Sequence, residues 1–344
     1  MTAVGPVRLG LIGCADVATR RVLPAVLRTA GIELVAVASR SPAKARATAA
    51  RFGAAAVHGY HALLERADID AVYVPLPGAL HAEWITRALR AGKHVLAEKP
   101  LTTDLRETTG VLELARAAGL VVQENYMFVH HAQHEHVGRL IRDGAIGEPR
   151  AFTAAFTIPG RPPGDIRLDP RLGGGALLDV AGYPVRAAQH LLGPQLVVAG
   201  AMLRTDPAVG VDTGGAALLI RPDGVTAQLT FGFDHGYVAA YQLIGSTGSI
   251  RTEHAFATPA GEPPQVWLRR RDARELLTLP PDDQYANAVA WFRSAVLAGT
   301  PADPAIAAQA RLIEEIRQAA DRAAAYPAEL SGPACGDSPN PTSP

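Results

Sequence analysis

A lysine at the end of a buried strand is the first feature of this sequence that could do chemistry. Residues 95–97 form a short apolar run, typical of a strand inside a parallel sheet, and Glu98, Lys99 and Pro100 follow directly. Ligands of such sheets bind outside the carboxyl ends of the strands, so we expect Lys99 at a site. Pro100 restricts the backbone of Lys99 and makes a cis peptide bond accessible, which would aim the ammonium group. The alternative is an ordinary surface lysine that ends a strand.

A short loop after the first predicted strand, residues 7–12, has the form of a dinucleotide-binding turn. Gly13 would allow the tight turn, Ala15 stands where the usual motif has a second glycine, and Ala18 allows close helix packing. The N-terminus of the following helix would bind a pyrophosphate through its backbone N–H groups. Cofactor contacts are predicted at Gly13, Cys14, Ala15, Asp16, Val17 and Ala18. The alternative is an ordinary strand-to-helix turn of a flavodoxin-like sheet.

The end of the second predicted strand, residues 33–39, indicates which dinucleotide would bind. NAD-binding proteins of this kind carry an acidic residue there, which binds the ribose 2′-hydroxyl. This chain has Ser39 and Arg40 instead, without a nearby carboxylate. Serine can donate a hydrogen bond to a 2′-phosphate, and arginine can pair with it and stack on adenine. We therefore expect NADP(H); the alternative for Arg40 is a solvated loop residue.

Strands and helices alternate in the first part of the chain, which predicts a Rossmann-type, doubly wound parallel sheet. From residue 151 strands dominate, separated by short turns rich in glycine and proline. That pattern predicts an α+β domain with a large, open, mostly antiparallel sheet that is covered on one face. We expect a Rossmann domain at residues 1–129, a substrate-binding and oligomerisation domain at 130–326, and a disordered tail at 327–344.

Composition argues against several partners. The 344 residues include 33 basic and 33 acidic side chains, so no net charge favours nucleic acid or an anionic membrane. No apolar run approaches membrane-spanning length, and residues 1–6 do not begin a signal peptide. Cys14 and Cys335 lie far apart, which favours a reducing, cytoplasmic setting without a disulfide.

The histidine-rich residues 130–136 suggest a metal site at first sight. Helical spacing would pair His130 with His134 and His131 with Glu135, on different faces of a helix. A zinc site needs three or four converging ligands, so we expect no metal and a polar start of an interdomain helix. One of these histidines could border a substrate. Similarly, strand alternation divides the arginines at 269–271 between two faces, which indicates a solvated edge.

Several motifs together resemble a known family. They are the N-terminal loop, Pro77 with His81, Glu98-Lys99-Pro100, the turn at 144–147, and Gly173-Gly174-Gly175 leading through Asp179 to Tyr183. With them the chain resembles the glucose–fructose oxidoreductase / inositol dehydrogenase / MocA (Gfo/Idh/MocA) family. Residues 71–77, 91–103 and 224–232 look most similar to actinomycete TDP-sugar C-3 ketoreductases. The resemblance implies NADPH-dependent reduction of the C-3 ketone of a TDP-3,4-diketo-2,6-dideoxyhexose, a step of deoxysugar biosynthesis for natural products such as antibiotics.

The resemblance also implies roles for particular residues. Lys99 would donate the proton to the nascent alkoxide, Tyr183 would hydrogen-bond the reacting oxygen, and Asp179 would hold the nicotinamide end or the sugar. A cationic lysine suits this task because carbonyl reduction builds negative charge on oxygen. Further cofactor contacts are implied at Tyr60, Leu76, Pro77, His81, Glu98, Lys99, Arg167 and Asp179. Substrate contacts are implied at Lys99, Tyr183, Phe156 and Tyr237.

Two departures from the family pattern leave details open. Ala15 replaces the usual second glycine of the loop, and Ala181 replaces a glycine often found between the aspartate and the next catalytic residue. The second departure leaves the orientation of Tyr183 open. Asp179 precedes a predicted helix, so its alternative role is an N-cap. The alternative for Tyr183 is an aromatic residue packed between domains.

We also expect a TDP-binding region and an oligomer, and two other functions remain in competition. The TDP moiety is expected near residues 156–167 and 234–241, where Arg167 could pair with a phosphate and Tyr237 or Tyr241 could stack. A homodimer or homotetramer is expected through the large sheet, whose residues Thr153, Phe156, Gln228 and Thr230 would need covering. Two functions compete with the ketoreductase: an NAD(P)-dependent polyol, aldose or dihydrodiol dehydrogenase, and a non-catalytic NADP-binding sensor.

Overall fold

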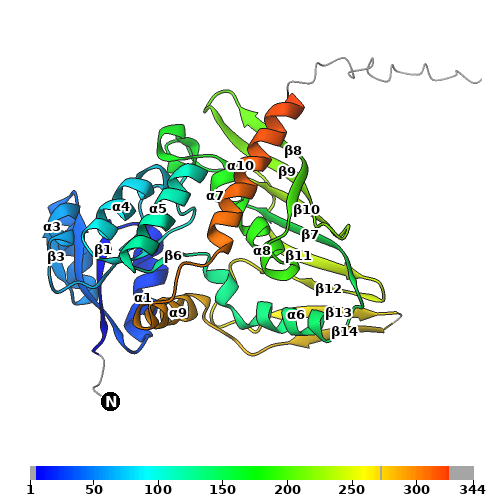
Figure 1. The fold of residues 1–344 in the computed structure, drawn as a ribbon, viewed down its shortest axis with the longest axis horizontal. Helices are drawn as coiled ribbons and strands as arrows, with labels where there is room; N and C mark the ends of the chain where they lie inside the picture. Colours follow the sequence, from blue (N-terminus) through cyan, green and yellow to red (C-terminus); the bar gives the residue numbers. More distant parts are fainter. Residues whose placement is uncertain (1–4, 272, 325–344) are drawn as a thin grey trace, which may run out of the picture.

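Six parallel strands form the first sheet, in the order β3-β2-β1-β4-β5-β6 (Figure 1). Their bounds are β1 Val7–Ile12, β2 Ile32–Ser39, β3 Ala55–His58, β4 Ala71–Val74, β5 His94–Ala97 and β6 Val122–Glu124. The central strands are buried on both faces, which explains their continuous apolar sequences. The computed structural model describes residues 5–271 and 273–324. It confirms the doubly wound sheet, whose strand order reverses beside β1 and so opens a crevice for a ligand.

Short helices cover both faces of this sheet. They are η1 Ala18–Val22, α1 Leu23–Arg28, α2 Pro42–Phe52, α3 Tyr60–Leu64, η2 Gly78–Leu80, α4 His81–Arg90, α5 Leu105–Ala118 and η3 Met127–His130. Local sequence sets several of their ends. Asp104 caps α5 by accepting from the N–H of Arg106 at 2.7 Å, and Gly119 ends that helix in the left-handed conformation.

Eight strands form the second sheet, in the order β14-β13-β12-β11-β7-β10-β9-β8. Their bounds are β7 Pro149–Thr157, β8 Val197–Asp206, β9 Val211–Ile220, β10 Thr226–Gly232, β11 Val238–Gly245, β12 Gly248–Thr252, β13 Gln265–Arg270 and β14 Ala273–Thr278. All neighbours are antiparallel except β7 and β10, so the predicted mostly antiparallel sheet is confirmed. The sequence did not predict β14. It is an exposed edge strand with charged residues, and it lacks the alternation of a half-buried strand.

The helices of the second unit are α6 Ala132–Arg142, η4 Ile166–Leu168, η5 Pro170–Leu172, α7 Ala176–Asp179, α8 Gly182–Leu192, α9 Gln284–Ala298 and α10 Ala305–Ala324. Several of them lie between its sheet and the first unit, among them α8 and α10 (Figure 1), whereas α6 packs against the part of the large sheet around β11. Helix α9 returns to the first unit, where Val289 and Phe292 are buried with Leu9 and Leu11 of β1. Helix α9 thereby completes the core of the first sheet.

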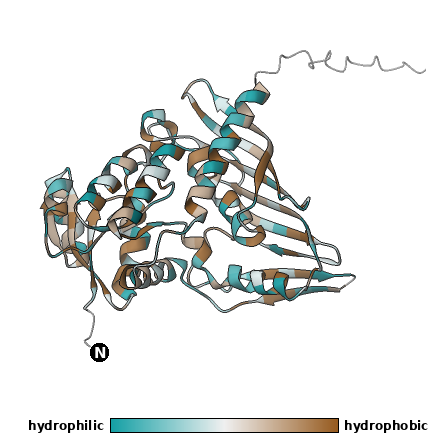
Figure 2. Ribbon diagram, viewed as in Figure 1, coloured by the Kyte–Doolittle hydropathy of each residue, from teal (hydrophilic) through white to brown (hydrophobic). Residues whose placement is uncertain are grey.

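The opposite face of the large sheet is open. Strand register places Thr153 beside Gln228, and Thr230 one row further along, on that face. Its exposed apolar side chains are Val197, Met202, Leu218, Val238, Ile244 and Leu276, and Figure 2 shows hydrophobic residues along these strands. Phe156 lies on the covered face, buried among aromatic rings, so the expectation that it belongs to the open face was wrong.

Two further expectations concern the C-terminal tail and membrane-spanning helices. The expected disorder at residues 327–344 lies outside the described residues. Within the described ranges, none of the helices combines the length and the apolar character needed to cross a bilayer.

Candidate active site

The turn after β5 brings Lys99 between the two sheets. The Lys99–Pro100 peptide bond is cis. The ammonium Nζ donates to the backbone oxygen of Asp179 at 2.7 Å and to Asp179 Oδ1 at 2.7 Å. Only 13% of the lysine side chain is exposed. Lys99 is therefore held by groups of the other unit, and the alternative of an ordinary surface lysine does not hold.

Asp179 is the last residue of α7, and its carboxylate bridges two cations. Oδ2 accepts from Arg167 Nε at 2.8 Å, while Oδ1 accepts from Lys99. The N-cap alternative was wrong, because Asp179 lies inside α7 as its last residue and the N-cap position of α8 is Ala181. Helix α7 is itself held at its start by Asp212 of β9, which accepts from the N–H of Leu177 at 2.6 Å.

Gly175 shows why a glycine must precede α7. Its φ of 115° lies in the region that favours glycine, and a Cβ at this position would overlap the carboxylate of Asp212. The glycine-rich segment thus lets Asp212 reach the helix start. This contact fixes the short helix that ends in Asp179.

Charges in the site favour an ionised Asp179 and a protonated Tyr183. Burial alone would raise the pKa of Asp179, but the charges and hydrogen bonds of Lys99 and Arg167 outweigh it and lower the pKa. Burial holds the pKa of Tyr183 well above its usual range, and the carboxylates of Glu98 and Asp179 raise it further. The Tyr183 hydroxyl therefore keeps its proton at neutral pH and can act as a donor.

Tyr183 lies at the start of α8, beside the lysine. Lys99 Nζ is 5.3 Å from the centre of the Tyr183 ring. The ring packs edge-on against Phe156, 4.6 Å between centroids, and against Tyr126 at 5.1 Å. Gly182 permits this packing, because a Cβ there would overlap the Tyr126 hydroxyl. The replacement at Ala181 therefore does not turn Tyr183 away from Lys99, and the tyrosine is both packed between domains and beside the lysine.

Glu98 is oriented by two buried donors that sequence reasoning missed. Its Oε1 accepts from the Tyr73 hydroxyl at 2.7 Å and from Asn125 Nδ2 at 2.7 Å. Tyr73 belongs to β4, and Asn125 follows β6. Asn125 had a usable signal, since it comes directly after a strand that ends at the same edge as β5.

The predicted dinucleotide loop follows β1 as expected. Gly13 has a φ of 96°, and a Cβ there would lie 2.8 Å from Leu76 Cδ2 and 3.6 Å from the Tyr60 hydroxyl. Gly13, Tyr60 and Leu76 are therefore neighbours. Cys14 Sγ lies 3.8 Å from the backbone oxygen of Lys44, and Asp16 pairs with Arg20 at 3.2 Å on the surface. Val17 and Ala18 begin the helical segment, whose first turn is a π-helix.

The end of β2 presents the residues expected at a 2′-phosphate. Ser39 is buried, and its Oγ accepts from the N–H of Ser41 at 3.1 Å. Arg40 is exposed beside Tyr60. Burial raises the pKa of Tyr60, and the nearby Arg40 guanidinium opposes the rise. Ser39, Arg40 and Tyr60 thus gather beside Gly13.

His81 lies elsewhere than expected. Pro77 and Leu76 are partly exposed at the edge of the sheet, but the His81 ring is fully buried. Its Nε2 lies 2.8 Å from the Leu76 oxygen and its Nδ1 lies 2.8 Å from the Pro100 oxygen. The imidazole therefore joins the two turns that follow β4 and β5 and leaves no ring atom exposed for a cofactor.

Tyr237 is an exposed aromatic residue of the second unit that lies close enough to act on Tyr183. Tyr237 is 48% exposed in the turn before β11. Arg167 is committed to Asp179 and to Asp165, 3.2 Å away. Tyr241 is buried, and its hydroxyl lies 2.9 Å from His134 Nδ1. Of the two tyrosines considered for stacking, only Tyr237 is accessible.

Two histidines at the start of α6, His131 and His134, make contacts inside the protein. His134 Nε2 lies 2.9 Å from the Ala255 oxygen, and burial lowers its pKa to about 3. His131 Nδ1 accepts from the N–H of Gln133 at 3.2 Å and so caps the helix. In the part of the chain that the structure describes, no three histidine, cysteine or acidic side chains are grouped closely enough to hold a metal ion.

Comparisons with known proteins agree with this geometry. Residues 7–126 match the model of an oxidoreductase family with an NAD-binding Rossmann fold, and residues 134–251 match the GFO/IDH/MocA C-terminal domain. The chain is 52% identical to a dTDP-3,4-didehydro-2,6-dideoxy-alpha-D-glucose 3-reductase of Streptomyces violaceoruber, over 92% of this chain and 96% of that protein. It is 34% identical to D-xylose 1-dehydrogenase (NADP(+)) 2 of Haloferax volcanii, over 84% and 89%.

A solved relative extends the comparison to three dimensions. It is a 3-ketoreductase from Actinomadura kijaniata in complex with NADP and TDP-benzene, with a TM-score of 0.89 and 49% identity over 92% of this chain and 98% of the other. Structures of the same enzyme include variants in which a tyrosine is replaced by phenylalanine and a lysine by alanine or glutamate. On the fold, the site and both family matches, the chain belongs to the Gfo/Idh/MocA family of NAD(P)-dependent oxidoreductases.

Proposed function

We propose that this chain reduces the C-3 ketone of a TDP-3,4-diketo-2,6-dideoxyhexose with NADPH. The observation that carries the proposal is the Lys99 ammonium group, which Asp179 holds beside the Tyr183 ring at the carboxyl edge of the parallel sheet. Identity of 52% to a 3-reductase of such a sugar supports the substrate. In the solved relative, the replaced lysine and tyrosine are separated by the same number of residues as Lys99 and Tyr183.

The residues of the site suit the chemistry of this reduction. NADPH, when bound, supplies a hydride to the carbonyl carbon, and the carbonyl oxygen then needs a proton. Lys99 stabilises the negative charge that develops on this oxygen and donates the proton. Tyr183 keeps its own proton and donates a second hydrogen bond to the same oxygen. Asp179, whose pKa Lys99 and Arg167 lower, holds the lysine in place through its backbone and carboxylate oxygens.

The remaining contacts divide into two groups. Gly13 to Ala18, Ser39, Arg40, Tyr60, Leu76, Pro77 and Glu98 surround the NADP(H) crevice. Tyr237, Phe156 and Tyr183 form the side of the second unit, where the TDP-sugar binds. His81 and Arg167 act one step removed, through Pro100 and Asp179. We assign the reaction to the cytoplasm and to deoxysugar biosynthesis for a natural product such as an antibiotic.

The competing functions fit less well. A polyol or aldose dehydrogenase is represented by D-xylose 1-dehydrogenase, to which identity is 34% rather than 52%. A non-catalytic sensor would need no proton donor, yet this chain keeps a lysine, a tyrosine and a carboxylate together at the site.

The experiment is an incubation with NADPH and the unstable diketo TDP-sugar, generated in situ. The expected product is the TDP-4-keto-2,6-dideoxyhexose with a new hydroxyl at C-3, identified by mass spectrometry and NMR. A reaction without enzyme is the control. NADPH oxidation only with free aldoses, and none with the TDP-sugar, would favour the dehydrogenase instead.

The open face of the large sheet is proposed to bind a second copy of the chain, in a homodimer or homotetramer. Leu218, Met202 and Val238 expose apolar area there, while Thr153 and Gln228 are uncharged. Leu218→Arg should therefore yield monomers in light scattering at micromolar concentration. Leu297→Arg, a similarly exposed leucine on α9, should leave the assembly unchanged. A monomeric wild-type chain would contradict this proposal.

A further inference from the structure

We propose that Glu124 and Arg186 form a buried positioning pair that holds the Lys99 turn in register with the helix that carries Tyr183. The inference rests on the proposed ketoreductase function. Neither residue touches the reacting atoms, and sequence reasoning predicted neither of them. They stand out because one ion pair connects the backbone beside Lys99 with α8, the helix that carries Tyr183.

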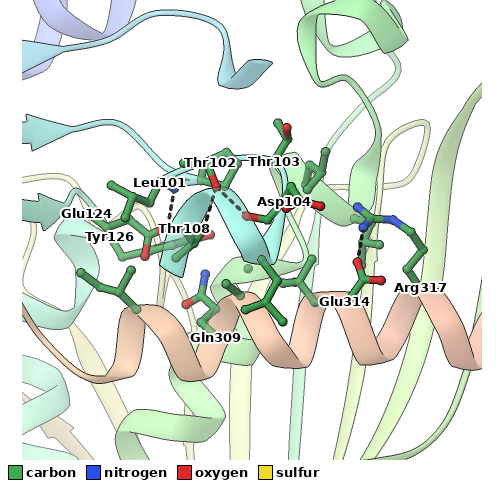
Figure 3. Close-up of a pocket in the computed structure, with 18 residues that line it drawn as sticks. Leu101, Thr102, Thr103, Asp104, Thr108, Glu124, Tyr126, Gln309, Glu314 and Arg317 are labelled. Carbon is green, nitrogen blue, oxygen red and sulfur yellow. Dashed lines mark hydrogen bonds and ion pairs between the residues drawn. The ribbon is translucent and has the colours of Figure 1, made fainter. Parts of the chain in front are cut away.

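The first half of the connection runs from Glu124 to the lysine turn. Glu124 ends β6, and its Oε1 accepts from the N–H of Leu101 at 2.8 Å. Leu101 lies two residues beyond Lys99, on the far side of Pro100. Figure 3 shows the Glu124 side chain directed at Leu101. The position of the turn therefore depends on a carboxylate from the neighbouring strand.

The second half runs from Glu124 to α8. Arg186 NH2 donates to Glu124 Oε2 at 2.6 Å, and only 6% and 4% of the two side chains is exposed. Arg186 lies three residues after Tyr183, about one helical turn. The guanidinium also donates to Gln309 Oε1 of α10 at 2.5 Å and reaches Asp303 at 3.4 Å. Its planar fork is thus fixed by partners on three segments.

Packing behind the turn is incomplete. A cavity of about 30 Å³ lies there, bordered by Pro100, Leu101, Glu124 and Gln309, and Figure 3 shows it between the turn and α10. An apolar residue at position 124 would leave the Leu101 N–H without its acceptor beside this space. The hydrogen bond to Glu124 is therefore the directional contact on that side.

The cost of burying the pair argues for a role beyond stability. Removing two charges from water is expensive, and apolar residues of similar size often replace a buried ion pair without loss of stability. Burial raises the pKa of Glu124, although Arg186 and the Leu101 N–H oppose the rise. A pair that contributes little net stability can still fix the relative position of the two segments that it joins. This pair joins the Lys99 turn to α8.

The deciding variant is Glu124→Met/Arg186→Met, which removes both charges together and leaves no uncompensated ion. We expect an unfolding temperature close to that of the wild type and unchanged NADPH affinity. Turnover per NADPH-binding site should fall about tenfold to a hundredfold, because small displacements of a catalytic group are costly. Counting active sites by NADPH binding removes any loss that comes only from unfolded protein.

Two further variants bracket this result. Glu124→Gln keeps an acceptor for Leu101 and should retain more turnover than the double variant. Lys93→Met is the matched control: Lys93 is buried at the opposite end of β5 and donates to the Arg66 and Ile69 oxygens at 2.8 Å. It should cost stability but leave turnover per site unchanged.

The outcomes separate this proposal from the proposed function. Wild-type turnover per site in the double variant overturns the positioning role and leaves the ketoreductase intact. If the double variant does not fold, Gln309→Leu decides, since it frees one branch of the guanidinium and should lower turnover per site in the same direction. Unchanged turnover there overturns the role as well. A wild-type chain that fails to reduce the TDP-sugar instead overturns the function.

Discussion

The Lys99 ammonium donates to both the backbone oxygen and the carboxylate of Asp179, at 2.7 Å each. Lys99 follows the parallel sheet, and Asp179 ends a short helix packed on the large sheet. The contact therefore joins the two halves of the molecule at the point where the chemistry is proposed. Because Asp179 also accepts from Arg167, the lysine is part of a charge cluster between the two domains.

Arg40→Ala is expected to weaken NADPH binding while leaving NADH binding almost unchanged. Loss of a charged hydrogen bond to the 2′-phosphate corresponds to about tenfold to a hundredfold in affinity. Titration of both cofactors measures the effect, and Arg116→Ala, an exposed arginine at the end of α5, is the control. Equal affinity of the wild type for NADPH and NADH would be incompatible with this account of Ser39 and Arg40.

Asp179 should make stability depend on pH in acid. Its pKa in the folded chain lies below the ordinary value of 3.8, so the unfolded chain takes up this proton first as pH falls. The stabilisation is therefore complete above the ordinary pKa and is lost as pH falls through the lower, folded-state value. Asp179→Asn should cost about 2 kcal/mol at neutral pH, and the difference from wild type should narrow in acid.

Denaturant unfolding of both proteins across the acid range measures this difference. A gap between wild type and Asp179→Asn that stays constant below the ordinary pKa would show that the carboxylate charge contributes nothing to folding.

Tyr237→Ala should raise KM for the TDP-sugar with little change in kcat. The exposed ring is proposed to stack on the nucleotide, and loss of such a contact costs about 1 kcal/mol, or several-fold in KM. Tyr237→Phe keeps the ring and should keep most of the affinity. Steady-state kinetics at saturating NADPH distinguish the two, and an unchanged KM in Tyr237→Ala places the TDP moiety on another wall of the cleft.

The fold was predictable where local pattern and burial agree. The apolar runs of β1, interrupted only by Arg8 and Gly10, and of β4 reflect burial on both faces of a parallel sheet, and Gly119 marks the end of α5. Strand β14 was not predicted from the sequence, because its residues are exposed and suit the edge of a sheet rather than a core. That α9 completes the core under β1 depends on tertiary packing, which no local pattern reports.

The site was predictable only for residues that stand next to strand ends. Lys99 and Gly13 follow β5 and β1 directly, so their place at the sheet edge follows from topology. Asp179 looked like a cap because α7, the four-residue helix that it ends, is too short to carry a periodic signal. Glu124 and Arg186 are separated by 62 residues, and a buried ion pair at that separation has no signature in the sequence.

The central claim is that Lys99 is the proton donor and Tyr183 its partner. Turnover with NADPH and the TDP-sugar, measured for Lys99→Met, Tyr183→Phe and the double variant, tests it most directly, with NADPH affinity as the control. Lys99→Met should lower turnover about a hundredfold to ten-thousandfold, Tyr183→Phe should cost less, and the double variant should be little worse than Lys99→Met alone, since groups that act together are non-additive. Near-native turnover in Lys99→Met would contradict the account.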